Sequence, residues 1–135
     1  MKLPAQSILL ISALFALTAN ADCGARLDEL WLSSHTIGSI SAAVPENLSA
    51  IGQLQGALTK EIEAEKSAIK NSTIECLAHL GGTNEVLCHT AINKYSRASR
   101  EIGFVLTNGN NEPRPDTGKV FWNSKAKIVD DCSKK

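Results

Sequence analysis

Apolar side chains recur every three or four residues along most of this chain, which is the spacing of one face of an α-helix. The clearest stripe covers residues 48–80, where apolar positions lie on one side and most charged residues on the other. Gly81-Gly82 follows at once and supplies a stop signal. No segment shows the strict alternation of a β-strand, so the pattern predicts an all-α protein. The predicted helices cover residues 24–41, 48–80, 84–106 and 119–132.

The predicted helices are joined mostly by short connections, which favours an up-down-up-down four-helix bundle formed by a single domain over residues 22–135. The loop 108–118 is polar and contains two prolines, which exclude a helix there. Glu65 falls on the apolar stripe of the second helix, and we expect its carboxylate to reach solvent from the edge of that stripe. Either Thr83 or Asn84 is expected to cap the third helix.

Residues 1–21 have the three parts of a cleaved secretory signal. A basic start at Lys2 precedes the apolar run 8–17, and the small residues Ala19 and Ala21 stand at the −3 and −1 positions of a cleavage site. A membrane-spanning helix needs about 20 apolar residues, and this run is much shorter. We therefore expect cleavage after Ala21, a secreted extracellular protein and no membrane span.

Four cysteines follow the predicted signal, an even number that indicates two disulfides in an oxidising compartment. In an up-down-up-down bundle all four lie at the same end. Cys76 and Cys88 flank the turn after the second helix, which favours the pairing Cys76–Cys88 with Cys23–Cys132. The alternative is Cys23–Cys76 with Cys88–Cys132, and loop-closure entropy does not separate the two.

Charge and sequons narrow the class of protein further. The chain carries 14 basic and 14 acidic residues, so it lacks the net cationic field that favours nucleic acid or an anionic membrane surface. Asn47 and Asn71 begin Asn-x-Ser/Thr sequons and are candidate N-glycosylation sites. Helical periodicity places Asn71 on the solvent side of its helix. These features are typical of an extracellular glycoprotein.

The three histidines do not form a recognisable catalytic or metal site. His79 lies three residues after Cys76, and His89 follows Cys88 directly. Adjacent helical residues point about 100° apart, which suits one tetrahedral zinc ion poorly. His35 follows two serines, yet the chain has no Gly-x-Ser-x-Gly elbow of a serine hydrolase. We therefore expect no catalytic residue, no metal and no cofactor.

The function that these features favour is binding, by an effector, ligand or inhibitor in an extracellular fluid. Phe104 points away from the stripe of the third helix, and Arg97 and Arg100 belong to its basic face, so these three residues are the candidate interaction surface. The end opposite the cysteines, with the 42–47 turn and the 108–118 loop, is expected to be free for function.

Two other functions stay open beside an extracellular protein partner. One is a carrier that holds a small lipophilic ligand between the helices, and the other is an enzyme of unrecognised type. An aromatic content of 4% and slim aliphatic stripes favour a filled core over an internal cavity, which weighs against the carrier.

Overall fold

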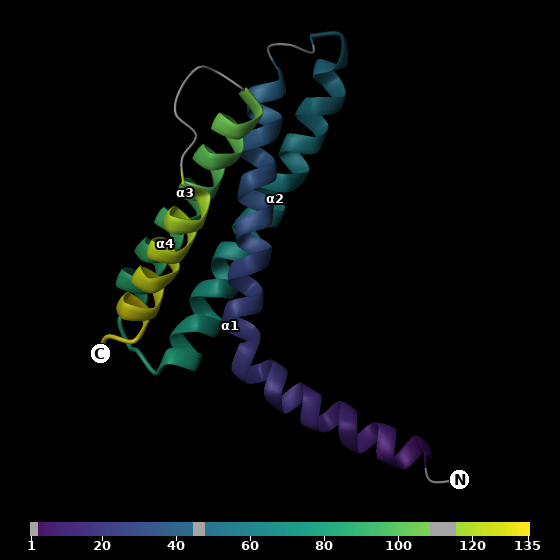
Figure 1. The fold of residues 1–135 in the computed structure, drawn as a ribbon, viewed down its shortest axis with the longest axis vertical. Coiled ribbons are helices and arrows are strands. Elements are labelled where there is room, and N and C mark those ends of the chain that lie inside the picture. The colour runs from purple at the N-terminus through teal and green to yellow at the C-terminus, as the bar shows by residue number, and fades with distance from the viewer. Residues whose placement is uncertain (1–2, 45–47, 109–115) are drawn as a thin grey trace.

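A computed structural model describes residues 3–44, 48–108 and 116–135, with side chains from Cys23 onward (Leu48 excepted). These residues form four α-helices and one short 3₁₀ turn, and no strand occurs among them. The predicted all-α four-helix fold is therefore confirmed. In chain order the elements are α1 (Leu3–Ala43), η2 (Leu48–Ala50), α2 (Ile51–Leu80), α3 (Glu85–Asn108) and α4 (Thr117–Cys132) (Figure 1).

The helix ends follow local capping signals. Gly81 ends α2 in the left-handed region, at a φ of 71°, where glycine has no steric penalty. The Asn84 side chain accepts a hydrogen bond of 3.0 Å from the backbone N–H of Leu87 and so caps α3. Asp116 caps α4 in the same way, with 3.1 Å to the N–H of Lys119. The first predicted helix differs most, because α1 begins at Leu3 instead of residue 24.

The central element of the bundle is α1. It packs most extensively along α3 and next along α2, while α4 lies against α3 (Figure 1). The helices α2 and α3 follow one another in sequence, yet they contact each other less than either contacts α1. At the end where α2 begins, α1 lies between α2 and α3.

Two glycines allow α1 and α3 to approach closely. A Cβ atom on Gly38 would lie 1.9 Å from the carbonyl oxygen of Arg100, and one on Gly103 would lie 2.1 Å from that of His35. Such contacts are possible only without a side chain. The hydroxyl of Ser39 donates a hydrogen bond of 3.3 Å to the carbonyl oxygen of Gly103 across the same crossing. The backbones of α1 and α3 are therefore in close contact at both glycines.

The hydrophobic core lies in the half of the bundle that holds the cysteines. The rings of Trp31 and Phe121 pack edge to face, with centroids 5.0 Å apart, and Tyr95 completes this aromatic group. The Tyr95 hydroxyl donates to the carbonyl oxygen of Leu27 at 3.0 Å, which satisfies its polar end inside the core. The buried core consists of Cys23, Leu27, Leu30, Cys76, Cys88, Ala91, Ile92, Tyr95, Ile128 and Cys132.

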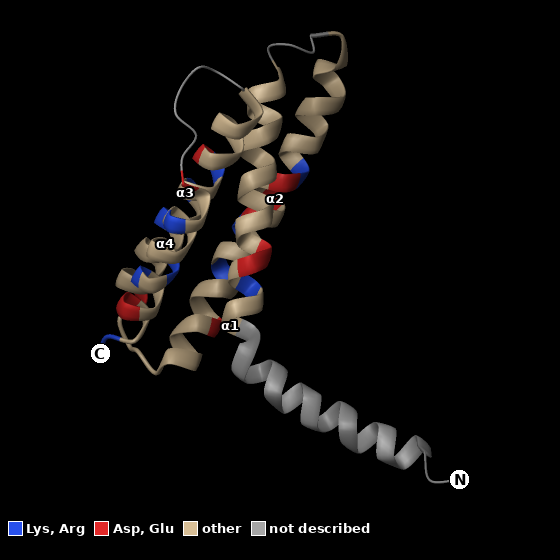
Figure 2. Cartoon of the chain, in the orientation of Figure 1, with Lys and Arg blue, Asp and Glu red and all other residues tan. Residues whose placement is uncertain are grey.

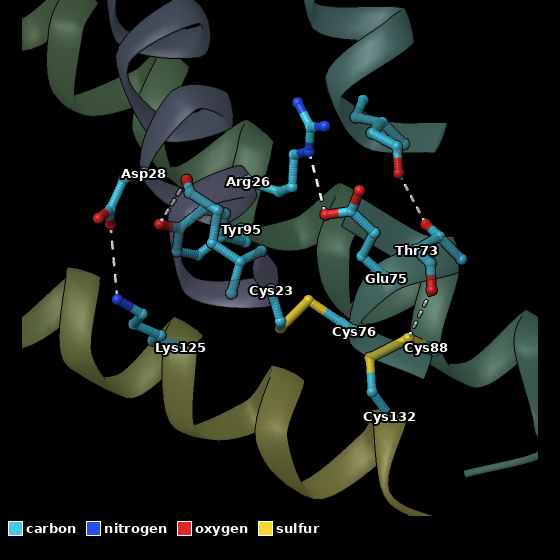
Figure 3. Close-up of a disulfide and its surroundings, with 12 residues drawn as sticks. Cys23, Arg26, Asp28, Thr73, Glu75, Cys76, Cys88, Tyr95, Lys125 and Cys132 are labelled. Carbon is cyan, nitrogen blue, oxygen red and sulfur yellow. Dashed lines mark hydrogen bonds and ion pairs between the residues drawn. A yellow bond between two sulfur atoms is a disulfide. The ribbon is translucent and has the colours of Figure 1, made fainter. Parts of the chain in front are cut away.

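The four cysteines form two disulfides at one end of the bundle, and Figure 3 shows the two bridges close together. They join Cys23 to Cys76 and Cys88 to Cys132. The favoured pairing, Cys76–Cys88 with Cys23–Cys132, is therefore wrong, and the alternative pairing is the one present. The placement of all four cysteines at the same end is confirmed.

The packing partners of the helices explain this correction. A short turn brings residues of α2 and α3 to the same height, but it does not make their side chains face each other. The helices α1 and α2, and likewise α3 and α4, pack on each other more extensively than α2 packs on α3, and the two disulfides join these pairs. The end of α4 also lies over the turn, where the N–H of Thr83 donates to the carbonyl oxygen of Lys134 at 3.0 Å.

Peptide mapping without reduction tests the pairing. Digestion with trypsin and a glutamate-specific protease cuts after Glu85 and separates the second cysteine from the third. We expect fragment 76–85 to remain linked to the fragment that holds the first cysteine, and fragment 86–94 to the one that holds the fourth. A direct link between fragments 76–85 and 86–94 would contradict the structure.

Candidate functional site

Glu65 lies at the centre of a buried polar cluster between α1, α2 and α3. Only 6% of its side chain is exposed. Its carboxylate accepts a hydrogen bond from the Ser34 hydroxyl at 2.8 Å and from Nε of Arg100 at 2.8 Å, and a second Arg100 nitrogen binds its other oxygen. The hydroxyls of Ser34 and Ser96 are 2.7 Å apart. The expectation that Glu65 reaches solvent is therefore wrong.

The electrostatics of this cluster favour the charged pair. Burial of the Glu65 carboxyl raises its pKa, but hydrogen bonds from Arg100 and Ser34 and the charge of Arg100 more than offset this, so the pKa lies below its usual value. The hydrogen bond to Glu65 raises the pKa of the Arg100 guanidinium in turn. Arg100 is thus held in an ion pair with Glu65, although 39% of its side chain is exposed.

One signal in the sequence points to this pair. Glu65 and Arg100 stand at equal distances along the chain from the Gly82-Thr83 turn, so an antiparallel hairpin of α2 and α3 brings them to the same height. Their opposite charges fit that placement. The two serines carry no comparable signal, because small polar residues occur at many helical positions.

Phe104 lies at the end of the bundle remote from the disulfides, with 42% of its surface exposed. It borders a groove of about 250 Å³ that α1 and α3 form together. Arg97 is exposed on the same helix. The other residues that line this groove are Ile37, Gly38, Ser41, Arg100 and Glu101.

This remote end carries no charged side chain over three described segments. Residues 35–44, 48–59 and 102–108 contain no Lys, Arg, Asp or Glu, and Figure 2 shows the charges gathered along the rest of the bundle. The α2 part of this end is also loosely covered, since no side chain among residues 51–64 is fully buried. We call residues 35–44, 48–59 and 102–108 the uncharged end.

Several predicted sites have a definite place in the structure. Asn71 is exposed on α2, as a glycan acceptor requires, whereas Asn47 lies outside the described residues. Half of the 42–47 turn and most of the 108–118 loop are likewise outside them.

The described histidines and cysteines do not gather into a metal site. All four cysteine sulfurs form disulfides, so none is free to act as a thiolate ligand. His89 contacts the Thr73 hydroxyl through Nδ1 at 3.4 Å. Among the residues that the structure describes, no three His, Cys, Asp or Glu side chains are grouped to hold a metal ion.

Within the described part of the chain, none of the helices has the length and apolar character needed to cross a membrane. No protein-family model, no curated protein and no solved structure matches this chain. Function is therefore inferred from the chain's own residues.

Proposed function

We propose that this is a secreted extracellular protein that acts by binding a protein partner, as an effector, ligand or inhibitor, through its uncharged end. The signal-like segment 1–21 and two buried disulfides support an oxidising compartment outside the cell. In protein collected from a culture medium, the peptide that holds Cys23 would begin at Asp22.

The contrast between the two halves of the bundle is the observation that carries this proposal. One half holds the disulfides and the buried core, while the other leaves Phe104 exposed and has no charged side chain over the segments defined above. Protein interfaces are depleted of charged residues at their centre and enriched in aromatic ones. Over its three segments the uncharged end lacks charged side chains, and it presents the exposed aromatic side chain of Phe104.

The core weighs against a carrier with an internal cavity. Leu30, Ile92, Tyr95 and Ile128 are completely buried and fill the space between the helices at the disulfide end. A ligand enclosed there would have to displace these side chains, at the cost of the packing that stabilises the fold.

Substitution of Phe104 by aspartate tests the proposal. The mature protein, immobilised and exposed to the fluid into which its source secretes it, should retain a partner, whose affinity is then measured with the purified components. We expect Phe104→Asp to lower that affinity about tenfold or more, since exposed aromatic residues are frequent hot spots.

The matched control is Val129→Asp, which places the same charge on an exposed apolar position of α4 near the disulfides. It should leave the affinity unchanged. If both variants bind equally well, or both lose the partner equally, the uncharged end is not the binding surface.

A further inference from the structure

A second surface feature lies between α2 and α3 in the disulfide half. Two adjoining hollows, of about 280 and 230 Å³, share Thr73, Ile74 and Glu85 and so form one groove. Along α2 it extends from Lys66 to Ala78, which is about 18 Å at the rise of an α-helix. The groove is therefore elongated along α2.

Its wall on α2 is aliphatic. Ile74 is 54% exposed, and Ile69 and Leu77 are half-buried beside it. Together with Ala78 they line the groove on one side of the helix. An alkyl chain that covers this exposed apolar surface removes it from water, which lowers the free energy.

The groove is basic at the end away from the Gly81–Asn84 turn. Lys66, Lys70 and His89 all line this end. Lys66 pairs with Glu63 at 3.4 Å, but both side chains are exposed and such a pair is weak. Lys70 forms no ion pair with a described residue. Glu85 lines both hollows, and in the hollow that contains Lys66 and Lys70 the two lysines outnumber its one carboxylate.

We infer that this groove binds a fatty acid anion, with the carboxylate at Lys66, Lys70 and His89 and the alkyl chain along Ile74 and Leu77. The length of the groove along α2 suits one alkyl chain. The balanced charge of the protein offers no general attraction to an anionic membrane. The site is separate from the uncharged end and does not depend on the proposed partner.

Laurate is the probe that tests this inference, titrated into the disulfide-bonded mature protein below its micelle concentration. We expect saturable binding of one laurate per chain and binding of the uncharged dodecanol about tenfold weaker. Anionic phosphatidylserine vesicles should not compete. Absence of saturable laurate binding, or preference for the vesicles, would overturn the inference.

Two variants locate the site. Leu77→Asp places a charge on the aliphatic wall and should weaken laurate binding more than about tenfold, whereas Val129→Asp should have no effect. The double variant Lys66→Glu/Lys70→Glu should weaken binding about tenfold. Circular dichroism of each variant is used to check that the fold is retained.

The charge control is Lys60→Glu/Lys119→Glu, which makes the same change in net charge at exposed positions outside the groove. Equal loss in both double variants would mean that binding is not at the groove and would overturn the inference. The Phe104→Asp variant should bind laurate normally. A failure of laurate binding would therefore leave the proposed protein partner untouched. A failure to find that partner would likewise leave the fatty acid site untouched.

Discussion

Replacing Arg100 with methionine is expected to destabilise the protein by about 3 kcal/mol, because it leaves the Glu65 carboxylate buried without its cationic partner. The hydroxyl of Ser34 is then the remaining donor that directly bonds the carboxylate. Methionine keeps the apolar part of the arginine side chain, so the measured loss reports mainly the charge. Urea unfolding followed by circular dichroism gives the free energy of unfolding.

The pH dependence of unfolding distinguishes this charge effect from lost packing. In the native protein the pKa of Glu65 lies below its value of 4.5 in the unfolded chain. The pair therefore contributes fully above pH 4.5, and its contribution is lost as the pH falls through the lower folded pKa. Without Arg100, burial raises the pKa of Glu65, so the stability of the variant relative to wild type should recover as the pH falls. A constant difference at all pH values would contradict the role of the ion pair.

Two controls accompany this prediction. Arg97→Met removes an exposed arginine from the same helix and should change the free energy of unfolding by less than about 0.5 kcal/mol. The double variant Glu65→Met/Arg100→Met removes both charges and should be more stable than Arg100→Met alone, since no unpaired charge then remains buried.

Gly103→Ala is the second change with a large expected effect. Its new methyl group would meet the carbonyl oxygen of His35 at 2.1 Å, which is backbone and cannot turn aside. The helices α1 and α3 would have to separate, and the contacts of the crossing would weaken. We expect the free energy of unfolding to fall by about 3 kcal/mol. Thermal and urea unfolding both measure this loss.

Gly56→Ala is a control that should raise the free energy of unfolding instead of lowering it. A Cβ atom on Gly56 meets nothing within 4 Å, and this residue is exposed in α2. Alanine should therefore stabilise that helix by about 0.5–1 kcal/mol. If Gly103→Ala behaves like Gly56→Ala, the close approach of α1 and α3 does not exist in solution.

The residues that stabilise this bundle and the proposed binding surface lie in different halves of it. The disulfides, the buried core and the Glu65–Arg100 pair hold the helices together, while the uncharged end presents Phe104 without fully burying the first half of α2. Such a division would let the proposed binding surface change without loss of the fold. It is also why variants of Phe104 are expected to fold normally.

The amino-acid sequence alone determined the helices, their caps and the placement of the cysteines. Apolar positions every three or four residues predicted α2 and α3 to within a few residues, and glycine and asparagine marked the turn between them. The same spacing located all four cysteines at one end. The helices and their caps are local features, because each depends on residues within a few turns of the same helix. The placement of the cysteines also depended on the up-down-up-down order that the short connections favour.

Only the tertiary structure decided which helices face each other. Periodicity gives the direction of a side chain about its own helix, but not the rotation of that helix against its neighbours. This is why Cys76 pairs with Cys23 instead of Cys88, and why Glu65 is buried among partners from two other helices. Gly38 and Gly103 set that arrangement, since their missing side chains let α1, and not α2, lie closest to α3.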